Sequence, residues 1–112
     1  MSPDRPTAAA SPAQQMQVQA EAASDLLKAM ANPQRLRVLC LLIEREMSVG
    51  EINALVDLSQ SALSQHLAVL REKNLVSTRR EAQTVYYAVS DGLVHDIIET
   101  LHTAFCSPGR AD

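Results

Sequence analysis

The chain has 112 residues, of which 46% are hydrophobic, and a formal net charge of −3 at pH 7. This length predicts one domain with a modest core, so association with a second copy would add buried surface. No apolar run is long enough to cross a membrane or to serve as an export signal, so we expect a cytoplasmic protein, without membrane contact, whose two cysteines are reduced.

The N-terminal part predicts a disordered arm followed by a helix. Residues 1–13, MSPDRPTAAASPA, hold three of the five prolines and show no apolar periodicity. We expect one folded domain over 14–106 and a C-terminal tail over 107–112. Its first helix, 14–30, has apolar residues at helical spacing, namely Met16, Ala20, Ala23, Leu26, Leu27 and Met30.

Capping signals predict the next helices. Asn32 followed by Pro33 predicts the start of a helix over 33–46, with an apolar stripe of Leu36, Leu39, Cys40 and Ile43. Ser48 with Glu51 three residues later is a capping box, which predicts a short helix over 49–56 with Ile52, Leu55 and Val56 facing inward.

A fourth helix is predicted from its N-cap Ser59 to about residue 73, and Asn74 can take the left-handed position after it. At 100° per residue, Leu63, Leu67 and Leu70 share one face and point to the core. The opposite face carries Ser61, Gln65, Ala68 and Glu72, with Ser64 at its edge. The outward face of the first two turns is therefore small, uncharged and able to hydrogen-bond.

The last third of the chain predicts a hairpin and a final helix. Val76, Thr78, Val85, Tyr87 and Val89 alternate with other residues, and the polar run 80–83 between them predicts a two-stranded hairpin with an exposed basic tip. Asp91 is the expected N-cap of a helix over 92–106, whose apolar stripe is Val94, Ile97, Ile98, Leu101 and Phe105.

This order of elements predicts a mainly α winged helix-turn-helix with a two-stranded β-hairpin wing, whose recognition helix enters the major groove of double-stranded DNA. The alternative is a small helical domain with a solvated polar face. Residues 59–90 carry a surplus of two positive charges, with four basic residues against two acidic ones. The candidate DNA-binding residues are Gln60, Ser61, Ser64, Gln65, His66, Lys73, Arg79 and Arg80.

Three stretches resemble the ArsR/SmtB-type repressors: LLKAMANPQRLRVLCLL, SVGEINALVDLSQSALSQHLAVLREKNLV and VYYAVSD. The resemblance covers about residues 24–91. It implies a homodimeric repressor, paired through its first and last helices, that leaves its operator when an effector binds.

The resemblance implies that many relatives bind metal ions, so a metal ion is the first effector to consider. The thiolate type places a Cys-x-Cys where this chain has Ser48, so that site is missing. The interfacial type uses the last helix, where His95, Glu99 and His102 share one face and form an alternative zinc site. Their spacing departs from the family's pattern, and a polar stripe beside an apolar dimer seam also explains them.

The pair Cys40 and Cys106 resembles the SqrR/BigR-like repressors, a dithiol subgroup that senses persulfides. That resemblance implies that reactive sulfur species cross-link the two thiols, weaken DNA binding and derepress sulfide-detoxification genes, without a cofactor. The residues alone leave another interpretation open. Cys40 lies in VLCLLI, where a cysteine is usually an apolar filler, and the end of a helix disfavours thiolate at Cys106.

Catalysis finds no support in the sequence. There is no Ser-His-Asp layout, no glycine-rich phosphate loop among three glycines, and no Cys-x-x-Cys activation. We therefore expect no enzymatic activity, with a pure interaction module as the remaining alternative to a DNA-binding regulator.

Overall fold

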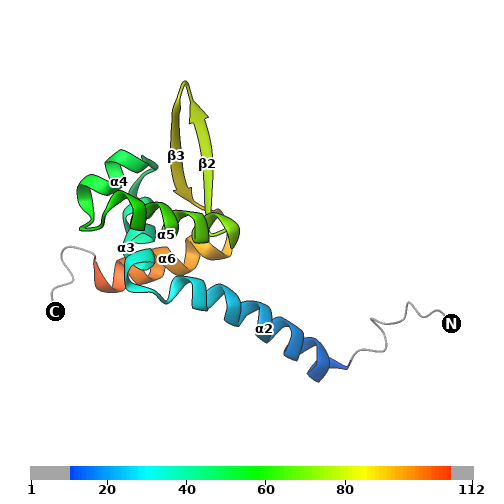
Figure 1. Ribbon diagram of the computed structural model, residues 1–112. Helices are drawn as coiled ribbons and strands as arrows, with labels where there is room; N and C mark the ends of the chain where they lie inside the picture. Colours follow the sequence, from blue (N-terminus) through cyan, green and yellow to red (C-terminus); the bar gives the residue numbers. More distant parts are fainter. Residues whose placement is uncertain (1–10, 107–112) are drawn as a thin grey trace.

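The computed structural model describes residues 11–106 (Figure 1). The N-terminal arm expected over 1–13 therefore lies outside the described residues up to position 10, as does the tail 107–112. The elements in order are α2 (Pro12–Met30), α3 (Pro33–Glu44), β1 (Met47–Ser48), α4 (Val49–Leu55), α5 (Gln60–Glu72), β2 (Val76–Glu81), β3 (Thr84–Val89) and α6 (Leu93–Phe105).

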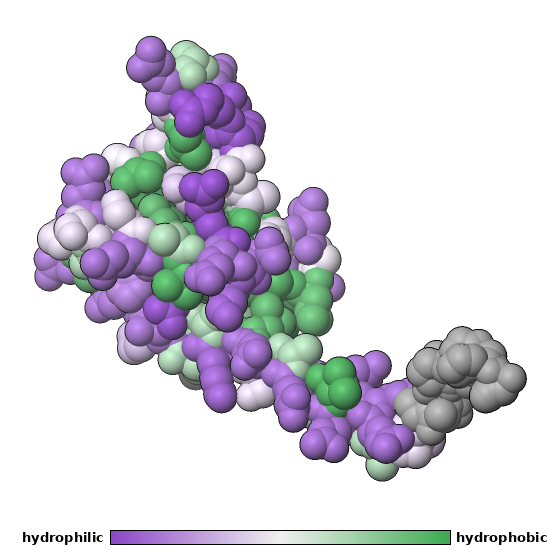
Figure 2. Space-filling view, turned by 45° about the vertical axis from the view of Figure 1, so that its right-hand side comes forward, coloured by the Kyte–Doolittle hydropathy of each residue, from purple (hydrophilic) through white to green (hydrophobic). Residues whose placement is uncertain are grey.

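Helix α2 projects away from the rest of the molecule (Figure 1). It begins two residues earlier than predicted, because Ser11 and Gln14 form a capping box and Pro12 occupies the first turn. Only Ala29 and Met30 are buried in it. Leu26 is partly buried against the core, but other apolar side chains of the helix are exposed in the described part of the chain: Leu27 is 52% exposed and Met16 is 64% exposed. In Figure 2 hydrophobic patches lie between hydrophilic ones along this helix.

Helix α3 is the centre of the core. Asn32 caps it as predicted, accepting hydrogen bonds from the backbone N–H groups of Gln34 and Arg35, but it ends at Glu44, two residues early. The predicted stripe was partly wrong: Leu39 is buried, but Leu36, Cys40 and Ile43 are only half-buried. The other buried positions are Val38 and Leu42, because α2, α5, α6 and β3 surround α3 on several sides.

Local capping signals begin both helices of the helix-turn-helix as expected, but Leu55, predicted to face inward on α4, is 54% exposed. Ser48 and Glu51 form the capping box of α4, and the Ser59 hydroxyl accepts from the N–H of Ala62 at the start of α5. Leu63, Leu67 and Leu70 are buried, which confirms the predicted inward face. After α5, Asn74 has a φ of 61°, the left-handed conformation predicted for it.

The wing is the predicted antiparallel hairpin of β2 and β3, and it projects away from the helices (Figure 1). A third strand was missed: β1 pairs with β3, so the sheet order is β1-β3-β2. Two residues are too few to show a period, which is why the sequence pattern could not reveal β1.

The N-cap predicted for α6 was wrong. The cap is Gly92, at a φ of 87°, and no side chain caps the helix; Asp91 is exposed one residue earlier. Glycine takes this positive φ without a steric penalty, so the chain turns into the helix through its backbone. Val94 and Ile98 anchor α6 in the core, whereas Phe105 is 81% exposed at its end. Within residues 11–106 no helix has the length and apolar character needed to span a bilayer.

Candidate DNA interface and thiol groove

The exposed face of α5 carries most of the candidate base-reading residues. Gln60, Ser61, Ser64 and Gln65 are all exposed; Ser61 and Gln65 lie on the side of the helix opposite its buried leucines, and Ser64 lies at the edge of that side. These side chains both donate and accept hydrogen bonds, and none is charged, so the early turns of α5 can approach base edges without burying a charge. Their role in DNA binding stays a prediction.

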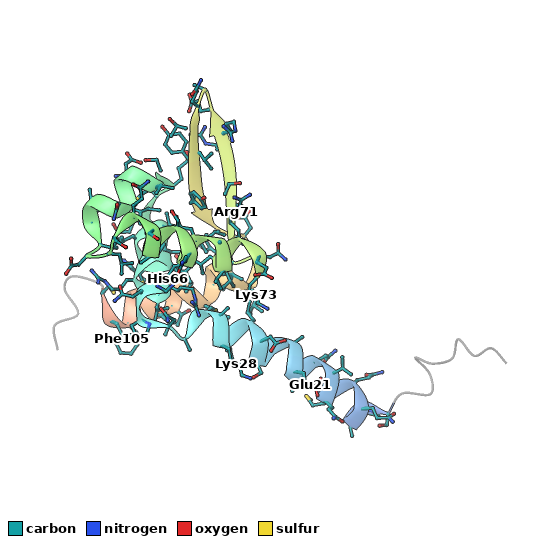
Figure 3. The ribbon with its side chains drawn as sticks, viewed as in Figure 1. Glu21, Lys28, His66, Arg71, Lys73 and Phe105 are labelled. Carbon is teal, nitrogen blue, oxygen red and sulfur yellow. The ribbon has the colours of Figure 1, made fainter. Side chains whose placement is uncertain are left out.

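His66 belongs to a different environment from its neighbours on α5. It is only partly exposed, and its Nδ1 lies 3.4 Å from Nη1 of Arg35 on α3, which can donate to it. Arg35 also donates from Nε to the carbonyl of Ala29, over 2.7 Å. In Figure 3 His66 lies where α5 passes the other helices. Through Arg35, His66 links α5 to α3 and to the end of α2.

Basic residues lie at the end of α5 and on the wing. Arg71 and Lys73 lie near the base of the wing (Figure 3), and hydrophilic side chains cover its outer part (Figure 2). Arg80 is exposed, and among residues 11–106 no carboxylate lies within ion-pair distance of it. Arg79 differs, because Glu46 and Glu81 already hold its guanidinium.

The two cysteines line one groove, of about 520 Å³, between α3 and α6. Cys40 is half-buried on α3 and Cys106 is exposed at the end of α6; both are free thiols. Most of the wall is apolar, formed by Pro33, Leu36, Leu41, Leu55, Leu101 and Phe105. The polar lining residues are Arg37, Glu44 and His102.

The environment of Cys40 suppresses its thiolate. Burial, as the largest effect, raises the pKa of this thiol to about 11; repulsion from and hydrogen bonding to Cys106 raise it as well, followed by repulsion from Glu44. Because the thiolate is the reactive form, Cys40 is a weak nucleophile at neutral pH.

Each of the two helices contributes a pair of residues to the groove. Cys40 and Glu44 lie four positions apart on α3, and His102 and Cys106 lie four positions apart at the end of α6. Nε2 of His102 lies 3.0 Å from Oε2 of Glu44, one helical turn from the cysteines. This contact holds the end of α6 over α3, and sequence reasoning missed Glu44 because its partner lies 58 positions away.

The alternative zinc residues do not form one group. His95 and Glu99 are 3.8 Å apart, and with Asp96 their ligand atoms lie within 4.8 Å of one another. His102 is engaged with Glu44 instead. The remaining cluster is mostly exposed and acidic, which is common on protein surfaces without a metal.

Comparison with known proteins identifies the family. The family model described as "Bacterial regulatory protein, arsR family" matches residues 32–78. The transcriptional activator HlyU of Vibrio cholerae is 54% identical over 97 residues, which are 87% of this chain and 90% of HlyU. The chain belongs to the ArsR family.

Solved structures of ArsR-family regulators agree with the fold. Reduced HlyU from Vibrio cholerae superposes with a TM-score of 0.78 at 54% identity, over 83% of this chain and 98% of HlyU. The transcriptional repressor BigR from Xylella fastidiosa also gives 0.78, at 34% identity, over 88% of this chain and 98% of BigR. The winged helix-turn-helix is confirmed: this ArsR-family chain is a DNA-binding transcriptional regulator and not an enzyme.

Proposed function

We propose that this regulator is a cytoplasmic homodimer that represses transcription at double-stranded operator DNA and leaves the operator when reactive sulfur species cross-link Cys40 and Cys106. The observation that carries the proposal is that both thiols line one groove, although 66 positions separate them in the chain. Similarity to BigR, which is named a repressor, and to HlyU, solved in its reduced form, supports it.

The surroundings of the two thiols favour reaction of one before the other. Cys106 is exposed, whereas Cys40 is held protonated, so Cys106 reacts first. Its thiolate attacks the outer sulfur of an organic persulfide, RSSH, and displaces RSH, which leaves a persulfide on Cys106. Arg37 supplies positive charge in the apolar groove, which attracts the carboxylates of an inducer such as glutathione persulfide, while its persulfide group reacts in the neutral form RSSH.

Two sulfur transfers complete the bridge. A second RSSH converts Cys40 to its persulfide and releases another RSH. The two protein persulfides then condense to a trisulfide and release H₂S, so two thiols and two RSSH yield one trisulfide, two RSH and one H₂S. If Cys40 attacks the inner sulfur of the Cys106 persulfide directly, the products are a plain disulfide and H₂S. A direct disulfide needs α-carbons within about 7 Å, whereas added sulfur atoms span a wider gap.

A cross-link between the two cysteines can change DNA binding through the packing of the helices. Helix α6 packs on α3, and α3 packs on α5. A bridge that draws the end of α6 toward α3 changes how α6 and α2 pair with a second copy. In a two-fold dimer this alters the spacing of the two recognition helices, which must match half-sites about 34–36 Å apart.

The test compares three effectors on reduced protein bound to a labelled duplex that the protein itself selects from a random library. We expect glutathione persulfide to release the duplex and to add sulfur within one chain by intact-mass analysis. Equal release by hydrogen peroxide with only a plain disulfide would overturn sulfur selectivity. Release by zinc without any change in thiol mass would favour the alternative site at His95, Glu99 and His102.

A further inference from the structure

Arg79 on β2 makes an unusually complete set of contacts for a wing residue. Its Nε lies 2.9 and 3.0 Å from the two carboxylate oxygens of Glu46, and its Nη2 lies 2.6 Å from Oε2 of the same residue. Nη1 lies 3.0 Å from Glu81. The guanidinium carbon also lies 4.7 Å from the centre of the Tyr86 ring. Such a bidentate, stacked arrangement fixes the side chain in direction as well as position.

These contacts cross the whole sheet. Arg79 pairs with Tyr86 on the central strand β3, and Tyr86 pairs in turn with Ser48 of β1. Glu46 directly precedes β1, so Arg79 reaches from one edge strand over the middle strand to the other edge. Ser48 is the N-cap of α4. Arg79 therefore ties the wing to the segment that begins the helix-turn-helix.

Arg80 lies on the other side of the same strand. Successive side chains of a strand point to opposite faces, so Arg80 shares its face with Val76 and Thr78, whereas Arg79 shares its face with Glu81. The cross-strand partner of Arg80 is Val85. With no carboxylate within ion-pair distance in the described chain, Arg80 keeps its charge available to phosphate.

We propose that Arg79 is a positioning residue, which with Glu46 sets the direction of the wing relative to the recognition helix, while Arg80 is the wing's contact to DNA phosphate. The carboxylates of Glu46 and Glu81 contact the one guanidinium of Arg79, so the three groups together carry a net charge of −1. A phosphate could bind there only by displacing the carboxylates. The inference uses the DNA binding of the reduced protein alone and does not depend on thiol chemistry.

The salt dependence of DNA binding separates the two roles. Each phosphate neutralised contributes about 0.9 to the slope of log K against log salt concentration. Using the duplex selected by the wild-type protein, we expect Arg80→Gln to flatten the slope by about 0.9 for each protomer bound. Arg79→Gln should lower affinity with the slope unchanged, and Glu46→Gln should lower it by the same factor.

Combined substitutions complete the test. The double variant Arg79→Gln with Glu46→Gln should bind no worse than either single variant, because both remove one interaction. The charge-swapped pair Arg79→Glu with Glu46→Arg should recover most of the affinity, and thermal unfolding checks that every variant is folded. A flatter slope for Arg79→Gln, or tighter binding by Glu46→Gln, would show that Arg79 contacts phosphate and overturn the proposal. Unchanged affinity in both single variants would overturn it too.

Discussion

The recognition helix and the thiol groove differ in how far apart in the chain their determinants lie. Helix α5 begins at its own N-cap Ser59, ends at the left-handed Asn74 and buries its own leucine stripe. The groove brings together Cys40 and Cys106, which lie 66 positions apart in the chain, and depends on how α6 packs on α3. A DNA-reading surface specified locally can therefore keep its form while a groove built by packing changes, which suits a regulator.

The largest expected effect tests whether packing of α6 builds the groove. Ile98 is fully buried on α6, so Ile98→Ala should lower the free energy of unfolding by about 2–5 kcal/mol through lost contacts and a cavity. Urea unfolding measures it. Thr103→Ala, at an exposed position of the same helix, should change the free energy of unfolding by no more than about 0.5 kcal/mol. Equal losses in the two variants would mean that α6 is not anchored at Ile98.

The second prediction concerns base reading by α5. Gln65→Ala should cost about 1–3 kcal/mol of discrimination at one base position, because an amide can hydrogen-bond a base edge in two places. Repeating the selection from a random library with the variant measures the altered preference. Lys73→Ala is the contrast: it should weaken binding to all sequences alike and flatten the salt dependence. A uniform loss with Gln65→Ala would place that side chain on the backbone instead.

Loss of a cap should have a smaller effect. Ser59→Ala removes the hydroxyl that accepts from the N–H of Ala62, so the free energy of unfolding should fall by about 1 kcal/mol. Ser59→Asn supplies another capping oxygen and should restore most of that stability. If chemical unfolding shows no difference between the alanine and asparagine variants, α5 does not depend on this local signal.

The smallest effect is a pH dependence that originates in the groove. The folded protein raises the pKa of Cys40 from 9.0 to about 11. Below pH 9 both the folded and the unfolded chain hold this proton, and the stabilisation is fully present. Between pH 9 and about 11 the unfolded chain loses the proton first, so stability falls across this range. Cys40→Ser should remove that part of the decline, measured by unfolding at each pH; an identical decline in the variant would contradict the assignment.

Prediction from sequence succeeded where the cause is local. The caps Asn32, Ser48 and Ser59 are adjacent to the helices they begin, and the leucine spacing in α5 shows its buried face directly. The prediction failed at the start of α6, because the N-cap is Gly92 and no side chain makes a capping hydrogen bond there.

The remaining features could not be predicted because they join distant segments. Glu46 meets Arg79 across 33 positions and Glu44 meets His102 across 58. The sequence pattern of a helix shows which residues share a face, but not which other helix covers that face. For that reason the sequence marked Cys40 and Cys106 as a pair only through a family resemblance, while the groove around them needed the folded chain.

The most direct test of the central claim measures DNA release by the two single-cysteine variants. Reduced wild-type protein, Cys40→Ser and Cys106→Ser are each bound to the same labelled duplex and treated with glutathione persulfide, and the bound fraction is followed by fluorescence anisotropy. We predict that all three bind equally well before treatment and that only the wild type dissociates. Dissociation of either variant to the same extent as the wild type would contradict a switch made of both thiols.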